Sequence, residues 1–304
     1  MTQLLNALPG ALAQGLIWGV MAIGVYITYK VLDIADLTVD GSICTGAAVC
    51  TMLLLGGQSP WLALLCAVLA GVLAGAVTGL LHVGLGIPPI LAGILTQMVL
   101  WSVNLKLLGK ANQALPARTT PVLLSQIDVG GALPVLLGFC VVLVALLVLF
   151  FGTELGCALR ATGCNPVMSR AQGVNTGLMK IIGLALSNGV VALSGALLCQ
   201  YQGYTDVNMG RGAVVIGLAA VVIGQAVLGR RGGRMAVQLG GVILGAVIYY
   251  IVYQVIIFAG FDTDLLKMFS AVVVAVFLGA PHVKAQLKAH SRSKKGDSGH
   301  AENE

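Results

Sequence analysis

Apolar segments of membrane-spanning length recur along the whole chain. A helix needs about 20 apolar residues to cross the roughly 30 Å of hydrocarbon in a lipid bilayer. Hydropathy predicts about nine such segments, within a range of roughly eight to ten. They are residues 10–32, 43–56, 60–83, 87–108, 134–152, 181–200, 213–229, 235–257 and 268–281. The second and seventh segments are short enough for one or both to be broken helices.

The composition excludes a water-soluble globular protein. Hydrophobic residues make up 58% of the chain and charged residues only 9%, whereas soluble domains carry about 25% charged residues. We therefore predict an all-α, polytopic transmembrane helical bundle over residues 1–281 and a tail over residues 282–304. The first half of the tail is basic, which favours contact with anionic lipid headgroups, and the rest is polar and expected to be disordered.

Lys and Arg collect in three segments outside the apolar runs, and the positive-inside rule places all three in the cytoplasm. These segments are the loop 153–180, the RRGGR turn 230–234 and the tail. The loops that contain Asp128, Asp206 and Asp262 then lie outside, together with the N-terminus, while the C-terminus is cytoplasmic. Miscounting one short span would change this assignment.

Residues that carry enzyme chemistry do not gather in this sequence. Three of the four histidines lie in the tail and His82 ends the third segment, so none can join a nucleophile and a carboxylate in a cleft. No G-x-x-x-x-G-K-[ST] phosphate loop occurs, and the cysteine spacing matches no zinc signature. We expect no catalytic site, no metal and no cofactor on this chain. If ATP drives transport, ATP and Mg²⁺ would bind a partner ATPase.

Two polar stretches interrupt the apolar pattern in similar ways, residues 33–49 and 201–221. Each holds two glycines five residues apart, namely Gly41 and Gly46 in the first and Gly212 and Gly217 in the second. The predicted topology brings the stretches in from opposite sides, as an inverted repeat would, although chance similarity is an alternative. Irregular backbone at membrane depth needs surrounding protein or water, so both stretches are predicted to border a translocation path. Their glycines permit turns and close helix contact.

Two parts of the chain resemble permease subunits of ATP-binding cassette (ABC) importers of the branched-chain amino acid and ribose type. The opening signature of that family, a Gly-rich helix running through a tyrosine and a short break to a Gly-Ala helix start, is similar to GLIWGVMAIGVYITYKVLDIADLTVDGSICTGA. The family's cytoplasmic coupling segment and following helix are similar to RATGCNPVMSRAQGVNTGLMKIIGLALSNGVVALSGALL. A subgroup of short permeases linked to tryptophan or tyrosine uptake is the most similar to DLTVDGS.

The resemblance implies a multi-pass permease of a bacterial inner membrane that forms one half of a pore. It implies a homodimer, two ABC ATPase subunits in the cytoplasm and an extracytoplasmic solute-binding protein. The solute would be a small polar molecule, with an amino acid ahead of a sugar or nucleoside. An ion-coupled secondary transporter and a channel are the alternatives.

The loop 153–180 is the segment that the resemblance assigns to ATPase coupling. Its sequence favours a short helix, because Asn165 can cap free N–H groups, Pro166 suits the first helical position and Gly173 can form a left-handed end. The residues expected to take part in coupling are Asn165, Pro166, Met168, Arg170, Gly173, Asn175 and Thr176. An ordinary amphipathic connector is the alternative reading of this loop.

Polar and aromatic residues within the apolar segments are candidates for the wall of the passage, because such groups are costly in lipid unless paired or wet. They are Thr45, Gln97, Trp101, Asn188, Gln225, Tyr249, Tyr253 and Gln254. Any of them can instead mediate helix packing. We expect no acidic residue deep in a span, with Asp33, Asp36 and Asp40 at a membrane edge, which argues against an ion-coupled transporter.

Overall fold

A computed structural model describes residues 2–116, 120–228 and 234–258, together with residues 268, 272 and 275. The elements in chain order are α1 (Thr2–Tyr26), the π-helix η1 (Ile27–Val31), α2 (Val39–Leu55), α3 (Pro60–Gly84), α4 (Pro89–Leu108), β1 (Asn112–Ala114), α5 (Val129–Gly152), α6 (Glu154–Cys164), α7 (Pro166–Ala171), α8 (Thr176–Gln202), β2 (Tyr204–Asp206), α9 (Ala213–Leu228) and α10 (Met235–Phe258). Residues 1–255 form one compact unit. The predicted ninth span apart from three residues, most of the RRGGR turn, the loop with Asp262 and the tail lie outside the described residues.

The predicted all-α membrane bundle is confirmed. Six helical segments of the described part are long and apolar enough to cross a membrane, namely α1 with η1, α3, α4, α5, α8 and α10. The apolar helices α2 and α9 are shorter. Each of the first eight predicted segments thus corresponds to a helix. Helix α2 begins at Val39, before the predicted residue 43, because the polar residues at its start lower the hydropathy without preventing a helix.

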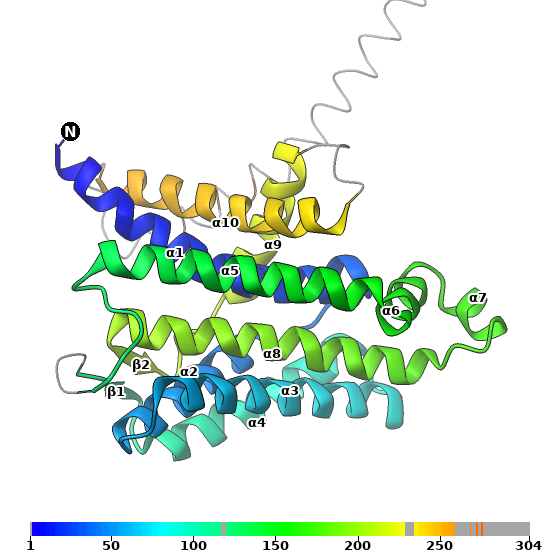
Figure 1. Cartoon of the computed structure of the whole chain (residues 1–304). Coiled ribbons are helices and arrows are strands. Elements are labelled where there is room, and N and C mark those ends of the chain that lie inside the picture. The colour runs from blue at the N-terminus through cyan, green and yellow to red at the C-terminus, as the bar shows by residue number, and fades with distance from the viewer. Residues whose placement is uncertain are drawn as a thin grey trace, which may run out of the picture. The chain divides into compact units, whose positions relative to one another are not determined.

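Helices α1 and α8 form the core of the bundle. The buried share of the membrane-length window is 78% for α1 with η1 and 72% for α8, against 28–39% for the other four long helices. Helix α8 packs against α1, α2 and α3, and Figure 1 shows these long helices lying roughly along one axis, with α8 running opposite to α1 and α3. The outer helices keep large apolar side chains exposed, such as Leu73 on α3 and Leu149 on α5, as a lipid-facing surface would.

Glycines bring α2, α3 and α8 into backbone contact. A Cβ atom at Gly46 of α2 would overlap the backbone of Ala192 in α8, and one at Gly75 of α3 would overlap that of Leu184. Gly195 of α8 lies equally close to the backbone of α2. Small residues allow such approach in lipid, where helix association rests on van der Waals packing. These three helices therefore form one tightly packed block.

Both short helices follow stretches without regular helix. Residues 32–38 precede α2 and residues 207–212 precede α9. Helix α2 has 17 residues, which at 1.5 Å each extend about 25 Å, so the irregular stretch completes its crossing. Each of these segments is thus a short helix with irregular backbone before it, and we use the term broken helix for this arrangement. Their relation as an inverted repeat stays a prediction.

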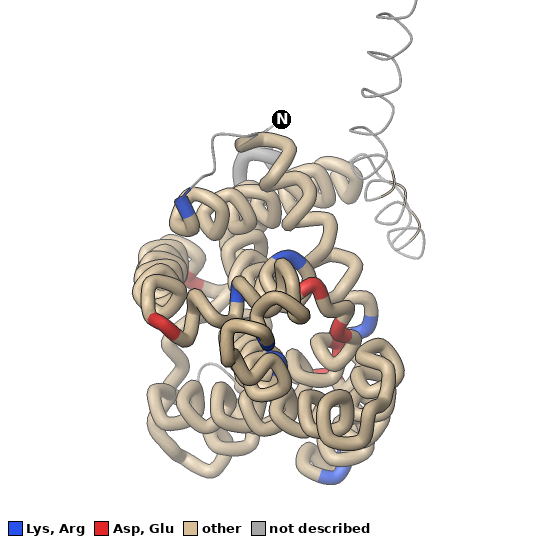
Figure 2. Tube along the Cα trace, turned by 90° about the vertical axis from the view of Figure 1, so that its right-hand side faces the viewer, with Lys and Arg blue, Asp and Glu red and all other residues tan. Residues whose placement is uncertain are grey.

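A small antiparallel sheet joins two loops at one end of the bundle. Strand β1 follows α4, β2 follows α8, and Asn112 lies opposite Asp206. Asp128 caps α5 in the same connection that contains β1. Helices α6 and α7 lie at the other end (Figure 1), and Figure 2 views that end, where basic and acidic positions are both visible. The loops with Asp128 and Asp206 thus share one end of the bundle, as the charge pattern predicts.

Candidate translocation site and coupling segment

The predicted short helix in the polar loop is present as α7. The side chain of Asn165 accepts hydrogen bonds from the backbone N–H groups of Val167, over 3.1 Å, and Met168, over 3.0 Å. Pro166 takes the first helical position. Gly173 follows the helix with a φ of +84°, a left-handed conformation that side chains with a Cβ rarely adopt.

A second cap and a side-chain bond close this segment into a compact turn. Asn175 accepts a hydrogen bond from the N–H of Leu178 over 3.1 Å and so caps α8. Arg170 Nε donates to Thr176 Oγ1 over 2.6 Å. Arg170 therefore holds α7 to the start of α8. The exposed apolar side chains of α7 are Val167, 77% exposed, and Met168, 58% exposed.

Helix α6 connects the turn to η1, which precedes the irregular stretch before α2. It packs against both η1 and α8, and Gly163 lies so close to the carbonyl of Val31 that a Cβ would overlap it. Arg160 donates to the carbonyl oxygen of Phe151 over 3.2 Å, which fixes α6 to the end of α5. A displacement of α6 and α7 would therefore act directly on η1 and on residues 32–38.

Asn188 ties the irregular stretch before α2 to the middle of α8. Its Nδ2 donates to Asp36 Oδ2 over 2.7 Å, and its Oδ1 accepts from Ser42 Oγ over 2.6 Å. Asp36 Oδ1 accepts from the N–H of Thr38 over 2.8 Å. Asn188 is fully buried in this network and also donates to the carbonyl oxygen of Leu184 in its own helix over 2.9 Å, so the side-chain bonds described for it are all within this chain.

The expectation that the acidic residues lie at a membrane edge is wrong for Asp36 and Asp40. Asp36 is buried and bonded to Asn188 halfway along α8, and Asp40 lies in the first turn of the broken helix α2. After η1 the chain keeps Leu32, Ile34 and Asp36 buried while Asp33 and Ala35 are exposed, and hydropathy could not reveal this burial for a polar stretch. The lack of deep carboxylates therefore cannot be used against an ion-coupled transporter.

Asp40 joins the two broken helices. Its carboxylate accepts hydrogen bonds from the backbone N–H of Gly212, over 2.9 Å, and of Val214, over 3.0 Å. These groups begin α9, where free N–H donors and the helix dipole favour a negative charge. Gly212 adopts a φ of +86° immediately before the helix. The starts of α2 and α9 thus meet at one half-buried carboxylate.

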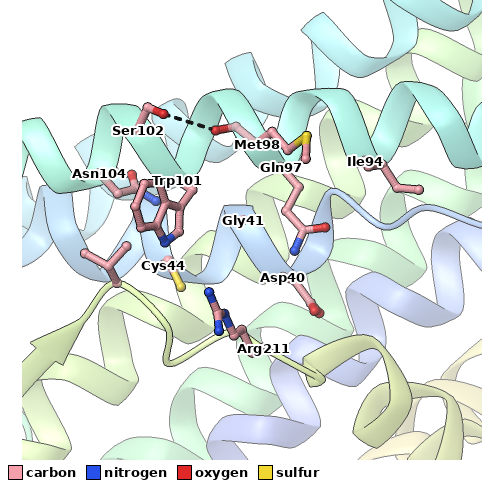
Figure 3. Close-up of a pocket in the computed structure, with 11 residues that line it drawn as sticks. Asp40, Gly41, Cys44, Ile94, Gln97, Met98, Trp101, Ser102, Asn104 and Arg211 are labelled. Atoms are coloured by element: carbon pink, nitrogen blue, oxygen red, sulfur yellow. Dashed lines mark hydrogen bonds between the residues drawn. The ribbon is translucent and has the colours of Figure 1, made fainter. Parts of the chain in front are cut away.

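A cavity of about 550 Å³ opens beside this junction. It lies between α2, α4 and the stretch before α9, and Figure 3 shows side chains reaching into it from these elements. The polar, charged and large apolar side chains in its wall include Asp40, Gln97, Met98, Trp101, Asn104 and Arg211. Gln97 and Trp101 are predicted passage residues. Sequence reasoning missed the other four, although Arg211 stands out as the basic residue within an irregular stretch between apolar segments.

The remaining passage candidates lie elsewhere. Thr45 is buried and donates to the carbonyl oxygen of Gly41 over 3.0 Å, and Gln225 is exposed on α9. Tyr249 is buried and stacks on Tyr253 with ring centroids 6.4 Å apart. Gln254 lines a different cavity of about 290 Å³, which Tyr201 also lines. The predicted residues therefore do not form a single wall in one chain.

The remaining predicted structural glycines lie at helix contacts. Gly41 packs on α4, where an added Cβ would lie 3.0 Å from Leu100 and 3.2 Å from the backbone of Gln97. Gly217 packs on α1, where the Cβ would lie 2.7 Å from Val25. Both positions thus favour the smallest residue, consistent with close helix approach.

Known proteins are similar to this chain over most of its length. The family described as branched-chain amino acid transport system, permease component, matches residues 8–280. A tyrosine transport system permease protein of Clostridioides difficile is 38% identical over 93% of this chain and 94% of its own length. An uncharacterised protein of Rickettsia prowazekii is 33% identical over 91% of this chain and 98% of its own length. The autoinducer 2 import system permease protein of Escherichia coli is 29% identical over 67% of this chain and 60% of its own length. No solved structure matches the chain.

Proposed function

We propose that this chain, which belongs to the family of permease components of branched-chain amino acid transport systems, carries an aromatic amino acid into the cell. The chain is a multi-pass membrane permease subunit of the ABC importer type. L-Tyrosine is the first candidate solute, because the C. difficile relative named for tyrosine transport matches nearly end to end. The import direction follows from the family.

Two copies of the permease would form the pore, with two ABC ATPase subunits below and a solute-binding protein above. ATP and Mg²⁺ would bind the ATPases. The bacterial inner membrane is the proposed location, with the β1–β2 end outside and α6 and α7 in the cytoplasm. The N-terminus then lies outside and the C-terminus in the cytoplasm, as the distribution of Lys and Arg favours.

The observation that carries coupling to an ATPase is the closed turn of residues 165–176. Two Asn caps, a left-handed glycine and the bond from Arg170 to Thr176 give it a fixed shape. Its exposed apolar residues Val167 and Met168 can enter a groove on a partner, since exposed apolar side chains that cluster at one point mark interaction surfaces. The contact between α6 and η1 then supplies a route from the ATPase to the broken helix α2.

Reconstitution tests the proposal. The permease, its ATPase and its binding protein would be placed in proteoliposomes, and uptake of radiolabelled L-tyrosine, L-tryptophan, L-leucine and ribose measured with and without ATP. We expect ATP-dependent uptake of the aromatic amino acids, and none with an ATPase variant that cannot hydrolyse ATP. Uptake that follows an ion gradient and persists without the ATPase would instead establish a secondary transporter.

A further inference from the structure

The cavity beside the two broken helices contains a buried amide with no partner. Asn104 is 1% exposed, and neither its Nδ2 nor its Oδ1 has a hydrogen-bond partner in the described structure. A buried polar group left unsatisfied is rare, because the loss of its hydrogen bonds to water is not compensated. Asn104 lines the cavity (Figure 3), so a polar group placed there could satisfy it.

Charges of both signs line the same cavity on the side opposite α4 (Figure 3). The Asp40 oxygens each accept a backbone N–H, and a carboxylate has further lone pairs that can accept from a ligand. Arg211 is exposed in the single chain, and none of the ion pairs among the described residues involves its guanidinium. A guanidinium facing hydrocarbon is costly, so this side of the cavity must face water or protein.

Helix α4 supplies the apolar part of the wall. The indole of Trp101 and the side chain of Met98 line the cavity, and Gln97 extends from the same helix toward the charged side (Figure 3). The volume of about 550 Å³ falls within the range of about 300–1,000 Å³ typical of small-molecule sites. An aromatic ring, a thioether and two amides beside opposite charges suit a ligand with a charged head and an apolar body.

We propose that this cavity is a binding site for a zwitterionic amino acid within the permease. Asp40 accepts from the ammonium group, Arg211 binds the carboxylate, and the amide of Asn104 satisfies its hydrogen bonds on the ligand. The side chain of the ligand packs against Trp101 and Met98. The inference deepens the proposed function, because it gives the transported amino acid a binding site within the permease. It rests on the proposed function for the direction of transport.

The pairing predicts which molecules the site rejects. An amine without a carboxylate leaves Arg211 without its partner, and an acid without an ammonium group brings a second negative charge toward Asp40. Hydrogen bonds to charged groups are worth about tenfold to a hundredfold in affinity. L-Tyrosine should therefore bind by at least that margin more tightly than tyramine or 3-(4-hydroxyphenyl)propionate.

Trp101 provides a direct readout, since the chain has three tryptophans. Trp18 and Trp61 would be replaced by Phe, which keeps a ring to pack against Tyr250 and Phe139 respectively. The permease with its ATPase, in nanodiscs, would be titrated with L-tyrosine, L-leucine, tyramine and 3-(4-hydroxyphenyl)propionate while indole fluorescence is recorded. We expect saturable changes with both amino acids and weak responses to the two analogues.

Two variants test the assigned contacts. Arg211→Gln should weaken L-tyrosine binding by about tenfold to a hundredfold and leave the response to tyramine nearly unchanged. Asn104→Leu should weaken binding while preserving or raising the melting temperature, because it removes an unsatisfied buried amide. Lys106→Gln is the matched control, an exposed cation on α4 that does not line the cavity, and should bind like the parent.

The outcomes separate the site from the function. The site is refuted by the absence of a saturable Trp101 response, by equal affinities for L-tyrosine and tyramine, or by an Arg211→Gln variant that behaves as Lys106→Gln. It is also refuted if the variants change only the association of two permease copies, which would mean that a second copy fills the cavity. Normal tyrosine uptake by Arg211→Gln would remove the site and keep the importer. Saturable binding without ATP-driven uptake of any amino acid would keep the binding site and refute the proposed importer.

Discussion

The carboxylate of Asp40, in the first turn of α2, accepts a hydrogen bond from the backbone N–H of Gly212, directly before α9, over 2.9 Å. The two residues are 172 positions apart in the chain. One side chain therefore holds together the two places where the membrane helices are interrupted. Any movement of one broken helix must carry the start of the other with it or break this bond.

Removing the Asp40 carboxylate should destabilise the start of α9. We expect Asp40→Ala to cost about 0.5–2 kcal/mol, the usual cost of losing a helix cap, because the N–H groups of Gly212 and Val214 lose their acceptor. Asp40→Asn keeps one acceptor oxygen and should lose less. The control is Asp128→Ala, which removes the exposed cap of α5. Melting temperatures of the purified permease give the comparison, and equal values for Asp40→Ala and the parent would contradict the assignment.

The bond between Asn188 and Asp36 can be tested by exchanging the two side chains. Asn188→Asp places a second carboxylate beside Asp36, since Asn188 Nδ2 now lies 2.7 Å from Asp36 Oδ2. The substitution should lower the free energy of unfolding by about 3 kcal/mol or more. Adding Asp36→Asn restores one amide and one carboxylate, so the double variant should recover most of the lost thermal stability. Recovery will be incomplete, because Asn188 also donates to the carbonyl oxygen of Leu184. No recovery at all would show that this pair does not matter for stability.

Helix contact through Gly46 predicts opposite effects for two alanine substitutions. Gly46→Ala forces apart α2 and α8 and should cost about 1–3 kcal/mol, as overpacking does. Gly138→Ala, in α5, meets no atom within 4 Å and should be neutral or stabilising by up to about 1 kcal/mol through helix propensity. Thermal unfolding monitored by size-exclusion chromatography distinguishes the two. The idea fails if both variants shift in the same direction by the same amount.

Coupling can be separated from backbone strain by comparing two left-handed glycines. Gly173 has a φ of +84° and Gly57 a φ of +77°, and neither would place a Cβ within 4 Å of another atom. Substitution by Val should strain both by about 1–2 kcal/mol. Only Gly173→Val should lower ATPase copurification and ATP-driven uptake, because Gly57 lies in the loop between α2 and α3 at the other end. Equal behaviour of both variants would reduce residues 165–176 to a plain connector.

Orientation can be measured with two equally exposed positions. Ile127 is 74% exposed at the β1–β2 end and Val167 is 77% exposed at the α7 end. In a background without other thiols, Ile127→Cys should react with an impermeant reagent added to intact cells, and Val167→Cys should react only after lysis. The reverse pattern would invert the proposed topology.

Hydropathy predicted the long helices because each buries or exposes a continuous apolar surface. It also marked both broken helices, since α2 and α9 are too short to cross alone. The Asn-Pro start and Gly end of α7 were readable because caps depend on neighbouring residues. Capping signals of this kind can be read from the sequence because they depend on adjacent residues and not on the rest of the fold.

The site depends on contacts that no local pattern encodes. Asp36 and Asp40 follow an apolar run and so look like residues that leave the membrane, yet their partners Asn188 and Gly212 lie more than 150 residues later. Asn104 stands in an otherwise apolar helix, where a polar side chain is as consistent with packing as with binding. Only the arrangement of α2, α4 and the stretch before α9 places Asn104, Trp101 and Arg211 around one space.

The β1–β2 sheet limits where a solute can enter. Beyond its paired strands, the backbone bonds from Leu115 to Gly203 and from Val207 to Ala111, of 2.8 and 3.0 Å, fasten the chain after α4 to the chain after α8. A solute that entered between α4 and α8 at this end would have to break these backbone hydrogen bonds. The side of the cavity that these bonds leave open is the side where Trp101 and Arg211 are exposed. In a pore of two permeases, each copy would then border the open side of the cavity in the other copy.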